Sequence, residues 1–542
     1  MNGALLVAGA TSDAGKSVLT AGICRWLHRQ GVAVAPFKAQ NMSLNSGVTP
    51  DGAEIARAQL VQAAAAGIPP EAAMNPVLLK PTSDRESQLI VMGQAQGGVE
   101  AGHYRRGTLL GVVLTALDDL RRRFDVVVCE GAGGIAEINL RAGDLANLGL
   151  AEPAGLPVLV VCDIDRGGVF ASAFGSLALL SPADQARVQG FLINRFRGDP
   201  ALLEPGIAEL ERRTGRPVLG VVPWLAELAH ALDAEDSLAL ERPPPPAGGE
   251  AALEVAVIRF PRISNFTDLD PLAAEPGVRV RYTADAGVVA GADLVVLPGT
   301  KSTVADLDWL RGRRLDQALV ARGRAGGPIL AICGGYQMLG ERIVDGVESR
   351  RGELPGLALL PVSTVFTEDK VLARPSGSAS AFGDEPVSGY EIHHGRVSRA
   401  GGEPLFQVSA TGGAAERATG GAGFEEGCRA GAVLGTCWHG VLERDGFRRA
   451  VLSWVAATRA IDWEPGSRPF ASIREARLDV LGDLITRHVD TTALTRLIEG
   501  GGAAALPVVK TRLVKTRLVK TRLVEARLAE ARLAGGGAGL PC

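Results

Sequence analysis

The sequence predicts an α/β protein made of two parallel-sheet domains, the first of which carries a phosphate-binding loop. Two observations lead to this prediction. Short apolar runs alternate with longer helical stretches on both sides of a Pro-then-Gly run at residues 241–250, and such alternation is typical of parallel sheets. The 542 residues also exceed the ~250–300 at which a single hydrophobic core stops growing, so we expect more than one domain.

Composition and charge exclude several classes of protein. The net formal charge is -3 and charges of both signs are nearly balanced, which argues against a nucleic-acid or membrane-surface partner. No apolar run approaches the ~20 residues of a membrane span, and no signal-peptide pattern precedes the first expected strand. The seven cysteines form no C-x-x-C pair, which argues against a zinc site or a disulfide framework. We therefore expect a cytoplasmic protein.

We divide the chain into a phosphate-loop domain (1–240), a linker (241–250), a second α/β domain (251–460), a C-terminal helical segment (461–500) and a tail (501–542). Strands are expected at 4–8, 32–36, 126–129, 158–162, 190–193 and 218–222 in the first domain, and at 253–259, 294–297 and 328–332 in the second. Residues 473–497 have an amphipathic helical pattern, with Ser472 placed to cap its start. Residues 509–533 repeat a five-residue unit, which matches neither a helix nor a strand and predicts a low-complexity extension.

A phosphate-binding loop is expected directly after the first strand. Residues 9–17 read Gly-Ala-Thr-Ser-Asp-Ala-Gly-Lys-Ser, and a helical stretch at 18–29 follows them. In this context, backbone N–H groups and the positive end of the helix face an anion. Ala10 stands where the standard spacing has its first glycine, so the loop is a variant, and an ordinary strand-to-helix turn is the alternative. The nucleotide-binding residues would be Gly9, Asp13, Gly15, Lys16, Ser17 and Asn194.

Side chains near this loop also predict a magnesium site. Lys16 would reach the outer phosphates of the nucleotide, and Ser17 would contribute its hydroxyl to a Mg²⁺ shell. Glu130 ends the third strand, where NTPases of this type place a second Mg²⁺ contact, and Asp51 could add a carboxylate. Asn194 ends another strand, and a side-chain amide there can pair with an adenine edge. The expected metal ligands are therefore Ser17, Glu130 and Asp51.

The stretch at 36–46, after the second strand, is rich in amide side chains and poor in helix formers. It has two interpretations: a capped surface loop, or a set of hydrogen-bond donors that holds a polar substrate or phosphates. Under the second interpretation, the substrate-binding residues are Gln40, Asn41, Ser43 and Asn45.

The second domain carries a candidate cysteine nucleophile. At residues 329–340 an apolar strand turns sharply at Cys333 and becomes a helix, which is the arrangement of a nucleophile elbow. A helix N-terminus lowers the pKa of a thiol, so the thiolate becomes available. His439 can act as the base of a Cys–His acyl-transfer pair, and N–H groups of Gly299 and Gly334 could form an oxyanion hole. The alternative for Cys333 is a buried, inert cysteine.

Together these stretches resemble the cobyric acid synthase family, the glutamine-hydrolysing amidases of cobalamin biosynthesis. The matching stretches are 9–17, 36–46, 74–84, 130–140, 163–170, 261–268, 333–340 and 389–393, and the resemblance runs from residue 1 to about 497. It implies a first domain like dethiobiotin synthetase and a second like a class I glutamine amidotransferase. It also implies that Cys333 is the nucleophile and His439 the catalytic histidine.

The resemblance further implies a reaction. The b, d, e and g carboxylates of adenosylcobyrinic acid a,c-diamide would be amidated to give adenosylcobyric acid, and each amide would use one ATP and one L-glutamine. Most class I amidotransferases have a Glu two residues after the histidine. Val441 stands there in this sequence, as is typical of the cobalamin branch, so the group that orients His439 stays open.

Three alternatives share parts of this pattern. The cobyrinic acid a,c-diamide synthase has both modules and differs in the carboxylates that it amidates. A partition-type ATPase switch usually carries an extra lysine in its loop, which is absent between Gly9 and Ala14, and has no use for Cys333 and His439. A pseudo-glutaminase, whose second domain only regulates, is disfavoured because both of these residues are present.

Overall fold

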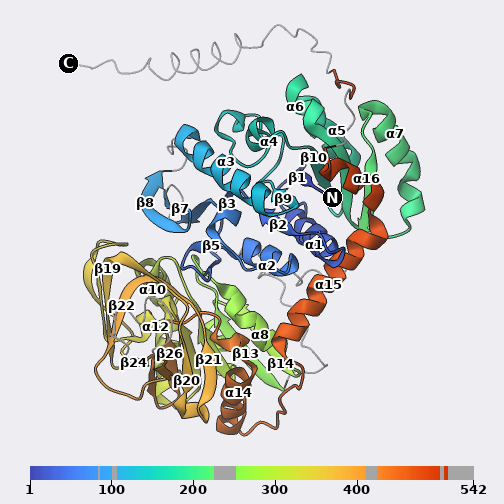
Figure 1. Ribbon diagram of the computed structural model, residues 1–542. Helices are drawn as coiled ribbons and strands as arrows, with labels where there is room; N and C mark the ends of the chain where they lie inside the picture. Colours follow the sequence, from blue (N-terminus) through green and yellow to red (C-terminus); the bar gives the residue numbers. More distant parts are fainter. Residues whose placement is uncertain (83–85, 101–105, 225–251, 410–423, 501–505, 511–542) are drawn as a thin grey trace, which may run out of the picture.

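The computed structural model describes residues 1–82, 86–100, 106–224, 252–409, 424–500 and 506–510. These residues form two α/β domains that lie next to each other, each built on a largely parallel sheet with flanking helices (Figure 1). The expected linker at 241–250 and the expected tail, apart from residues 506–510, lie outside the described residues.

The first domain is built on a six-stranded parallel sheet, and every strand expected there is present. The strands are rich in Val and Leu because both faces of a parallel sheet are buried. Side chains alternate between the faces, so Leu6 and Ala8 join one core while Leu5 and Val7 join another. The strand order is β12 (Val218–Pro223), β11 (Val188–Phe196), β10 (Val158–Asp163), β1 (Gly3–Gly9), β9 (Val126–Glu130) and β2 (Val34–Phe37).

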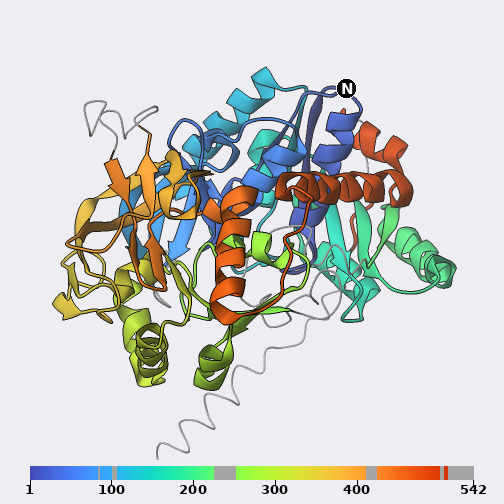
Figure 2. The same ribbon diagram turned by 90° about the horizontal axis from the view of Figure 1, so that it is seen from below.

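Helices cover both faces of this sheet. On one face lie α3 (Arg106–Arg123), α4 (Leu148–Ala154), α5 (Val169–Leu179) and α7 (Glu204–Thr214), with α6 (Pro182–Arg187) beside α4. On the other lie α1 (Lys16–Arg29), α2 (Arg57–Ala65), α15 (Phe470–His488) and α16 (Thr491–Ile498). Figures 1 and 2 show the orange-red α15 leaving the second domain and lying against α1.

The C-terminal segment therefore completes the core of the first domain. Leu481 and Ile485 of α15, and Leu494 of α16, belong to the same hydrophobic core as Leu5 of β1. The helical pattern at 473–497 is confirmed, but the structure divides it into two helices.

The start of α15 differs from the expectation at Ser472. Pro469, with an extended backbone, is the N-cap residue, and the N–H of Phe470 donates to Asp445 Oδ1 at 2.9 Å. The prediction that Ser472 caps this helix is wrong, because a capping residue precedes the helical backbone and Ser472 already lies in the first turn.

Between residues 40 and 100 the described chain forms a small sheet and a hairpin that were not expected from the sequence. Both hairpin strands and one strand of the sheet have three residues, which is too short to show a period. The sheet order is β3 (Gln40–Met42), β6 (Val77–Pro81), β7 (Glu86–Val91) and β8 (Gln94–Glu100), and the hairpin joins β4 (Ser46–Val48) to β5 (Glu54–Ala56). The hairpin lies against β22 (Glu391–Arg399) of the second domain, so it forms part of the interface between the domains.

The second domain has its own six-stranded sheet, which includes the three strands expected there. Its order is β14 (Val278–Thr283), β13 (Leu253–Ile258), β15 (Leu294–Leu297), β16 (Ile329–Ile332), β26 (Val433–Thr436) and the antiparallel β25 (Cys428–Ala430). Its helices are α8 (Asp270–Ala273), α9 (Ala286–Gly291), α10 (Thr303–Gly312), α11 (Leu315–Arg324), α12 (Gly334–Leu339) and α14 (Asp445–Arg459).

Two further four-stranded sheets of the second domain were not expected from the sequence. One has the order β18 (Gly352–Pro355), β17 (Arg342–Asp345), β19 (Val362–Ala373) and β22. The other has the order β21 (Glu385–Ser388), β20 (Ser376–Ala379), β23 (Phe406–Val408) and β24 (Phe424–Glu426).

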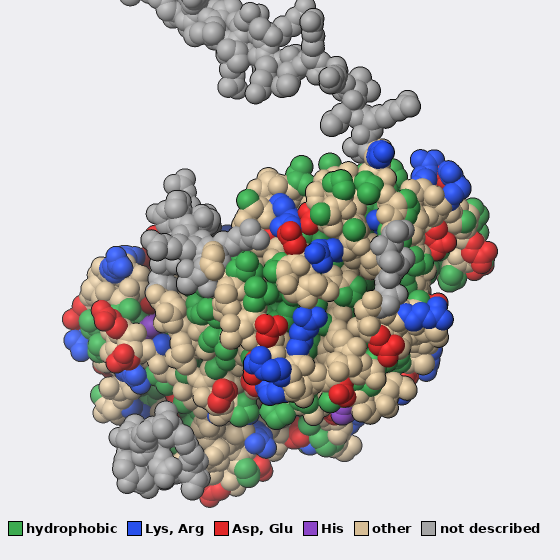
Figure 3. Space-filling model, turned by 45° about the horizontal axis from the view of Figure 1, so that its top comes forward, with side chains coloured by type: hydrophobic (Ala, Val, Ile, Leu, Met, Phe, Trp, Pro, Cys, Tyr) green, Lys and Arg blue, Asp and Glu red, His purple; other side chains and the backbone are tan. Residues whose placement is uncertain are grey.

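The surface carries charges of both signs. On the face drawn in Figure 3, Lys and Arg side chains are interspersed with Asp and Glu side chains. Within the described residues, no helix combines the length and the apolar character needed to cross a membrane.

Candidate active sites

The phosphate-binding loop lies between β1, which ends at Gly9, and α1, which begins at Lys16. Gly15 has a φ of 91°, and a Cβ there would come within 2.1 Å of Asn194 Nδ2, so this position requires glycine. The Lys16 ammonium donates to the carbonyl oxygens of Gly133 (3.0 Å) and Thr11 (3.3 Å). Lys16 thus lies across the loop, where the outer phosphates of a nucleotide would sit.

Three other predicted nucleotide-binding residues lie at or beside this loop. Gly9 is close to Lys16, because a Cβ there would come within 3.0 Å of its Nζ. Asp13 is exposed in the loop with a φ of 54°. Asn194, at the end of β11, donates its amide N–H to Ala14 O at 2.9 Å. The amide nitrogen predicted to meet an adenine edge thus holds the loop in place.

Glu130, the last residue of β9, lies fully buried beside Ser17 because β1 and β9 are neighbours in the sheet. Its Oε1 accepts hydrogen bonds from Ser17 Oγ (2.8 Å) and Lys38 Nζ (2.7 Å), and its Oε2 accepts one from Gln62 Nε2 (2.5 Å). A buried carboxylate needs such partners, and Lys38 balances its charge. Neither Lys38 nor Gln62 has a role that could be predicted from the sequence, although Lys38 directly follows β2 at the same sheet edge.

The oxygen atoms of Ser17 and Glu130 fit a magnesium ion. Mg²⁺ prefers hard oxygen ligands and takes one or two protein groups beside phosphate oxygens and waters. Within the described residues no group of three His, Cys, Asp or Glu side chains is arranged to hold a metal.

Asp51, the third predicted metal ligand, does not join this cluster. It is exposed in the turn between β4 and β5, where its Oδ1 accepts a hydrogen bond from Thr49 Oγ1 at 2.5 Å. The neighbouring Gly52 lines a cavity formed mainly by the second domain. No contact found among the described residues joins Asp51 to Ser17 or Glu130. The structure thus places it at the domain interface, because the hairpin carries it away from the sheet edge.

The amide-rich stretch is not the surface loop of the first interpretation. Asn41, Ser43 and Asn45 are buried, while Gln40 is half-buried. Asn41 Nδ2 donates to Gln59 Oε1 (3.1 Å), and Ser43 Oγ donates to Asn45 O (3.1 Å). These bonds hold the chain between β3 and the hairpin, and the substrate-binding role of the four residues stays a prediction.

Cys333 lies at the sharp turn between β16 and α12. Its φ of 50° and ψ of -109° are strained for a residue with a side chain, and such strain is found at nucleophile elbows. Gly335 permits the close approach of α12 to the sheet, since a Cβ there would come within 2.2 Å of Leu297 O. The Cys333 N–H donates to Thr436 O at 2.8 Å and ties the elbow to β26.

His439 contacts Cys333 and is oriented by Asp268. Its Nδ1 lies 2.7 Å from Asp268 Oδ2, and the other oxygen of this carboxylate accepts the N–H of Gly440 at 2.8 Å. The ring also hydrogen-bonds Cys333 and stacks on Tyr390, with 5.3 Å between the ring centroids. Asp268 is therefore the third member of a Cys–His–Asp triad. The sequence alone did not identify this third residue, although Asp268 lies in the stretch 261–268 that resembles the family.

The charges of the triad favour a thiolate beside an imidazolium. Burial raises the pKa of the Cys333 thiol. This effect is outweighed by the charge and hydrogen bond of His439, together with the charge of His393 and the N–H of Gly334. The pKa of Cys333 is therefore lowered. Burial lowers the pKa of His439, but Asp268 and Cys333 reverse this effect and raise it to about 10. Each charged partner thus stabilises the other.

Two glycines predicted for an oxyanion hole lie at this site. The Gly334 N–H hydrogen-bonds Cys333. Gly299 lies against the imidazole, since a Cβ there would come within 2.8 Å of His439 Cε1. His393 on β22 was given no role from the sequence, yet it is buried near Cys333, and its Nε2 lies 3.3 Å from Glu391 Oε1.

We expect iodoacetamide to alkylate Cys333 faster at pH 7 than an ordinary thiol, because the reagent attacks the thiolate. His439→Ala removes the positive partner, so the midpoint of the rate against pH should move to higher pH. Peptide mass spectrometry would follow each cysteine separately. Cys129 and Cys162 are internal controls, because burial raises the pKa of each to about 12. An unchanged Cys333 profile in His439→Ala would contradict the ion pair.

Comparisons with known proteins agree with this arrangement. The family "CobQ/CobB/MinD/ParA nucleotide binding domain" matches residues 5–238, and the family "CobB/CobQ-like glutamine amidotransferase domain" matches residues 254–447. The predicted fold class, a nucleotide-binding parallel-sheet domain followed by an amidotransferase-like α/β domain, is thereby confirmed.

Curated relatives match nearly the whole chain. A cobyric acid synthase of Saccharopolyspora erythraea is 56% identical over 93% of this chain and 96% of its own length. Cobyric acid synthases of Frankia casuarinae and Streptomyces avermitilis are each 55% identical over 94% of this chain and 99% of their own length. The predicted enzyme class, a glutamine-dependent amidoligase, is confirmed by these relatives and the amidotransferase domain. The chain belongs to the cobyric acid synthase family.

Proposed function

We propose that this enzyme amidates the b, d, e and g carboxylates of adenosylcobyrinic acid a,c-diamide to give adenosylcobyric acid, using one ATP and one L-glutamine for each amide. The observation that carries the proposal is that one chain holds two sites of different chemistry. A phosphate loop lies beside Glu130 in the first domain, and a Cys333–His439–Asp268 triad lies in the second. The acceptor is proposed from the name of the curated relatives, cobyric acid synthase.

In the second domain, Cys333 would release ammonia from glutamine. The thiolate attacks the amide carbon, and the His439 imidazolium gives its proton to the leaving nitrogen, so that a thioester and ammonia form. Water then hydrolyses the thioester to glutamate with His439 as base. Asp268 keeps the imidazole in the required tautomer and orientation. N–H groups of Gly299 and Gly334 are proposed to stabilise the oxyanion of both tetrahedral intermediates.

In the first domain, ATP would phosphorylate a corrinoid carboxylate. The resulting acyl phosphate has a good leaving group, and attack by ammonia forms the amide and releases phosphate. Lys16 would offset the negative charge on the transferred phosphoryl group. Ser17 and Glu130 would hold Mg²⁺, which when bound neutralises charge on the phosphates.

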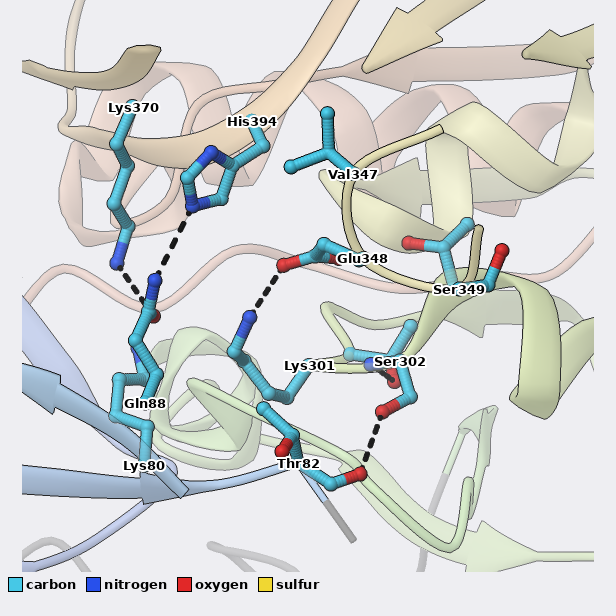
Figure 4. Close-up of polar contacts among 12 residues, drawn as sticks. Lys80, Thr82, Gln88, Lys301, Ser302, Val347, Glu348, Ser349, Lys370 and His394 are labelled. Atoms are coloured by element: carbon cyan, nitrogen blue, oxygen red, sulfur yellow. Dashed lines mark hydrogen bonds and ion pairs between the residues drawn. The ribbon is translucent and has the colours of Figure 1, made fainter. Parts of the chain in front are cut away.

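Ammonia would have to reach the acyl phosphate before water does, so we propose an enclosed path between the domains. A cavity of about 30 Å³ supports this path, because it is lined by Cys333 and His439 of the second domain and by Lys80 of the first. Such a volume holds one or two molecules the size of water or ammonia. Figure 4 shows side chains of both domains meeting here, with Gln88 between Lys370 and His394.

Asp268→Asn should reduce glutamine hydrolysis at pH 7 by roughly 10²–10⁴-fold, because an amide in place of the carboxylate favours the wrong imidazole tautomer. Ammonia release in the presence of ATP and acceptor is the measurement. Asp308→Asn is the matched control, because Asp308 pairs with Arg351 at the exposed surface of the same domain. Full activity of Asp268→Asn would remove Asp268 from the triad.

Cys333→Ala should lose amidation driven by glutamine but retain amidation driven by added ammonium, because the first domain keeps its whole site. Lys16→Ala should lose amidation with either nitrogen source. Amide formation is measured by mass spectrometry for both variants with both nitrogen sources. The results test whether the second domain releases ammonia and the first domain forms the amide. Failure of ammonium to support Cys333→Ala would contradict this assignment, as would substantial activity of Lys16→Ala.

The identity of the acceptor is tested by incubating the wild-type enzyme with adenosylcobyrinic acid a,c-diamide, ATP and glutamine. We expect the corrinoid to gain four amides, with one ATP and one glutamine consumed for each. Cobyrinic acid, which carries free a and c carboxylates, is the control acceptor for the a,c-diamide synthase reaction. Turnover of ATP and glutamine without a change in corrinoid mass would contradict the proposed acceptor.

A further inference from the structure

We propose that Asn265 is a positioning residue that makes the Cys–His–Asp triad depend on contact with the first domain. This inference rests on the proposed function, since it assumes that the triad supplies ammonia to that domain. The turn that carries Asp268 is tied through Asn265 to the hairpin of β4 and β5, so the triad keeps its geometry while the two domains are docked as they are here.

Asn265 links the two domains by two hydrogen bonds. Its side-chain Oδ1 accepts the N–H of Ser46, a residue of β4 in the first domain, at 2.9 Å. Its main-chain oxygen accepts the N–H of Asp268 at 3.0 Å. Asp268 in turn holds His439 at 2.7 Å. Two hydrogen bonds through Asn265 thus join the hairpin of the first domain to Asp268.

The backbone of Asn265 suits this role. Its φ of 50° and ψ of 37° lie in the left-handed region, which Asn and Gly adopt more readily than other residues. The residue is 3% exposed and precedes the short 3₁₀ helix Phe266–Leu269 on which Asp268 lies. The bonds described for Asn265 run to Ser46 and to the backbone of Asp268. Its side chain also lines the small cavity beside Cys333 and His439, so the test below has to separate positioning of Asp268 from direct contact with glutamine.

The hairpin end of this link is held by a buried ionic cluster that spans the interface. Ser46 Oγ and Lys80 Nζ donate to Glu54 Oε1 at 2.9 and 2.8 Å, and Lys370 of the second domain donates to Glu54 Oε2 at 2.5 Å. Glu54 is fully buried, and although burial raises its pKa, Lys370 and Lys80 lower it below its usual range. Separating the domains would leave this carboxylate with one cation fewer, which disfavours partial opening.

The same hairpin leads to the phosphate site. Helix α2 begins at Arg57, directly after β5, and its Gln62 donates to Glu130 Oε2 at 2.5 Å. Arg57 Nη2 also donates to Glu443 Oε1 at 3.0 Å in the second domain. A change in what Glu130 binds can therefore move α2 and the hairpin together, and Asn265 is where the hairpin meets the triad. These contacts form one continuous path between the two sites, and the variants below test whether it couples them.

The experiment compares two variants of the full-length enzyme. Asn265→Gly keeps the left-handed backbone but removes the acceptor of the Ser46 N–H, and Asn265→Asp keeps both. Glutamine hydrolysis is measured with and without ATP and acceptor, together with the amides formed per glutamine hydrolysed. For Asn265→Gly we expect kcat for glutamine to fall roughly tenfold, because that is the size of effect expected from the loss of one hydrogen bond. KM should be nearly unchanged. Amidation driven by ammonium should be retained, and Asn265→Asp should recover most of kcat.

A second variant tests the link from the side of the first domain. Glu54→Gln removes the charge that holds Lys370 without altering the second domain. It should lower kcat for glutamine hydrolysis, in the same direction as Asn265→Gly. Circular dichroism and thermal unfolding confirm that each variant is folded.

Three results would overturn the inference. The first is an unchanged kcat in Asn265→Gly. The second is a rise in KM alone, which would indicate that Asn265 binds glutamine directly. The third is an Asn265→Asp variant that behaves like Asn265→Gly. A wild-type enzyme that forms no amide from ammonium would instead overturn the proposed function, so the two failures are distinguishable.

Discussion

The hydrogen bond between Asp268 and His439 is the interaction on which the second domain's chemistry depends. Both side chains are almost completely buried, and a buried carboxylate persists only where donors and a positive charge meet it. The imidazolium and the Gly440 N–H supply them. Because His439 stays positively charged beside Asp268, it stabilises the thiolate of Cys333 in turn. Asp268 thus raises the pKa of His439, and His439 in turn lowers the pKa of Cys333.

The first domain also contains a buried carboxylate, Glu130, that is stabilised by donors and a positive charge. This carboxylate is fully buried at the end of a parallel strand, where Lys38 balances its charge and Ser17 and Gln62 donate to it. The Ser17 hydroxyl joins the carboxylate to the phosphate loop. Both candidate sites therefore pair a buried acid with groups from other elements, and neither arrangement exists until those elements pack.

The C-terminal helices explain how the two domains stay together. The chain leaves the second domain through α15, which returns to the first and packs on α1. Leu481 and Ile485 enter the core of the first domain, and burial of such a side chain contributes ~1.5–3 kcal/mol. The ion pairs between Arg25 and Glu475 and between Arg29 and Asp483 are exposed and contribute little in comparison. The apolar face of α15 thus fastens one domain to the other.

The sequence by itself determined the parallel strands, the phosphate loop at Lys16 and the elbow at Cys333. These features arise from periodicity and backbone geometry among neighbouring residues, so a local pattern contains them. Only the tertiary structure decided which carboxylates serve the sites. Asp268 lies 171 residues before His439 and reaches it, whereas Asp51 follows the second strand and is carried to the interface by a hairpin. Strand order and loop paths bring distant side chains together, and no local pattern encodes which acid will meet which base.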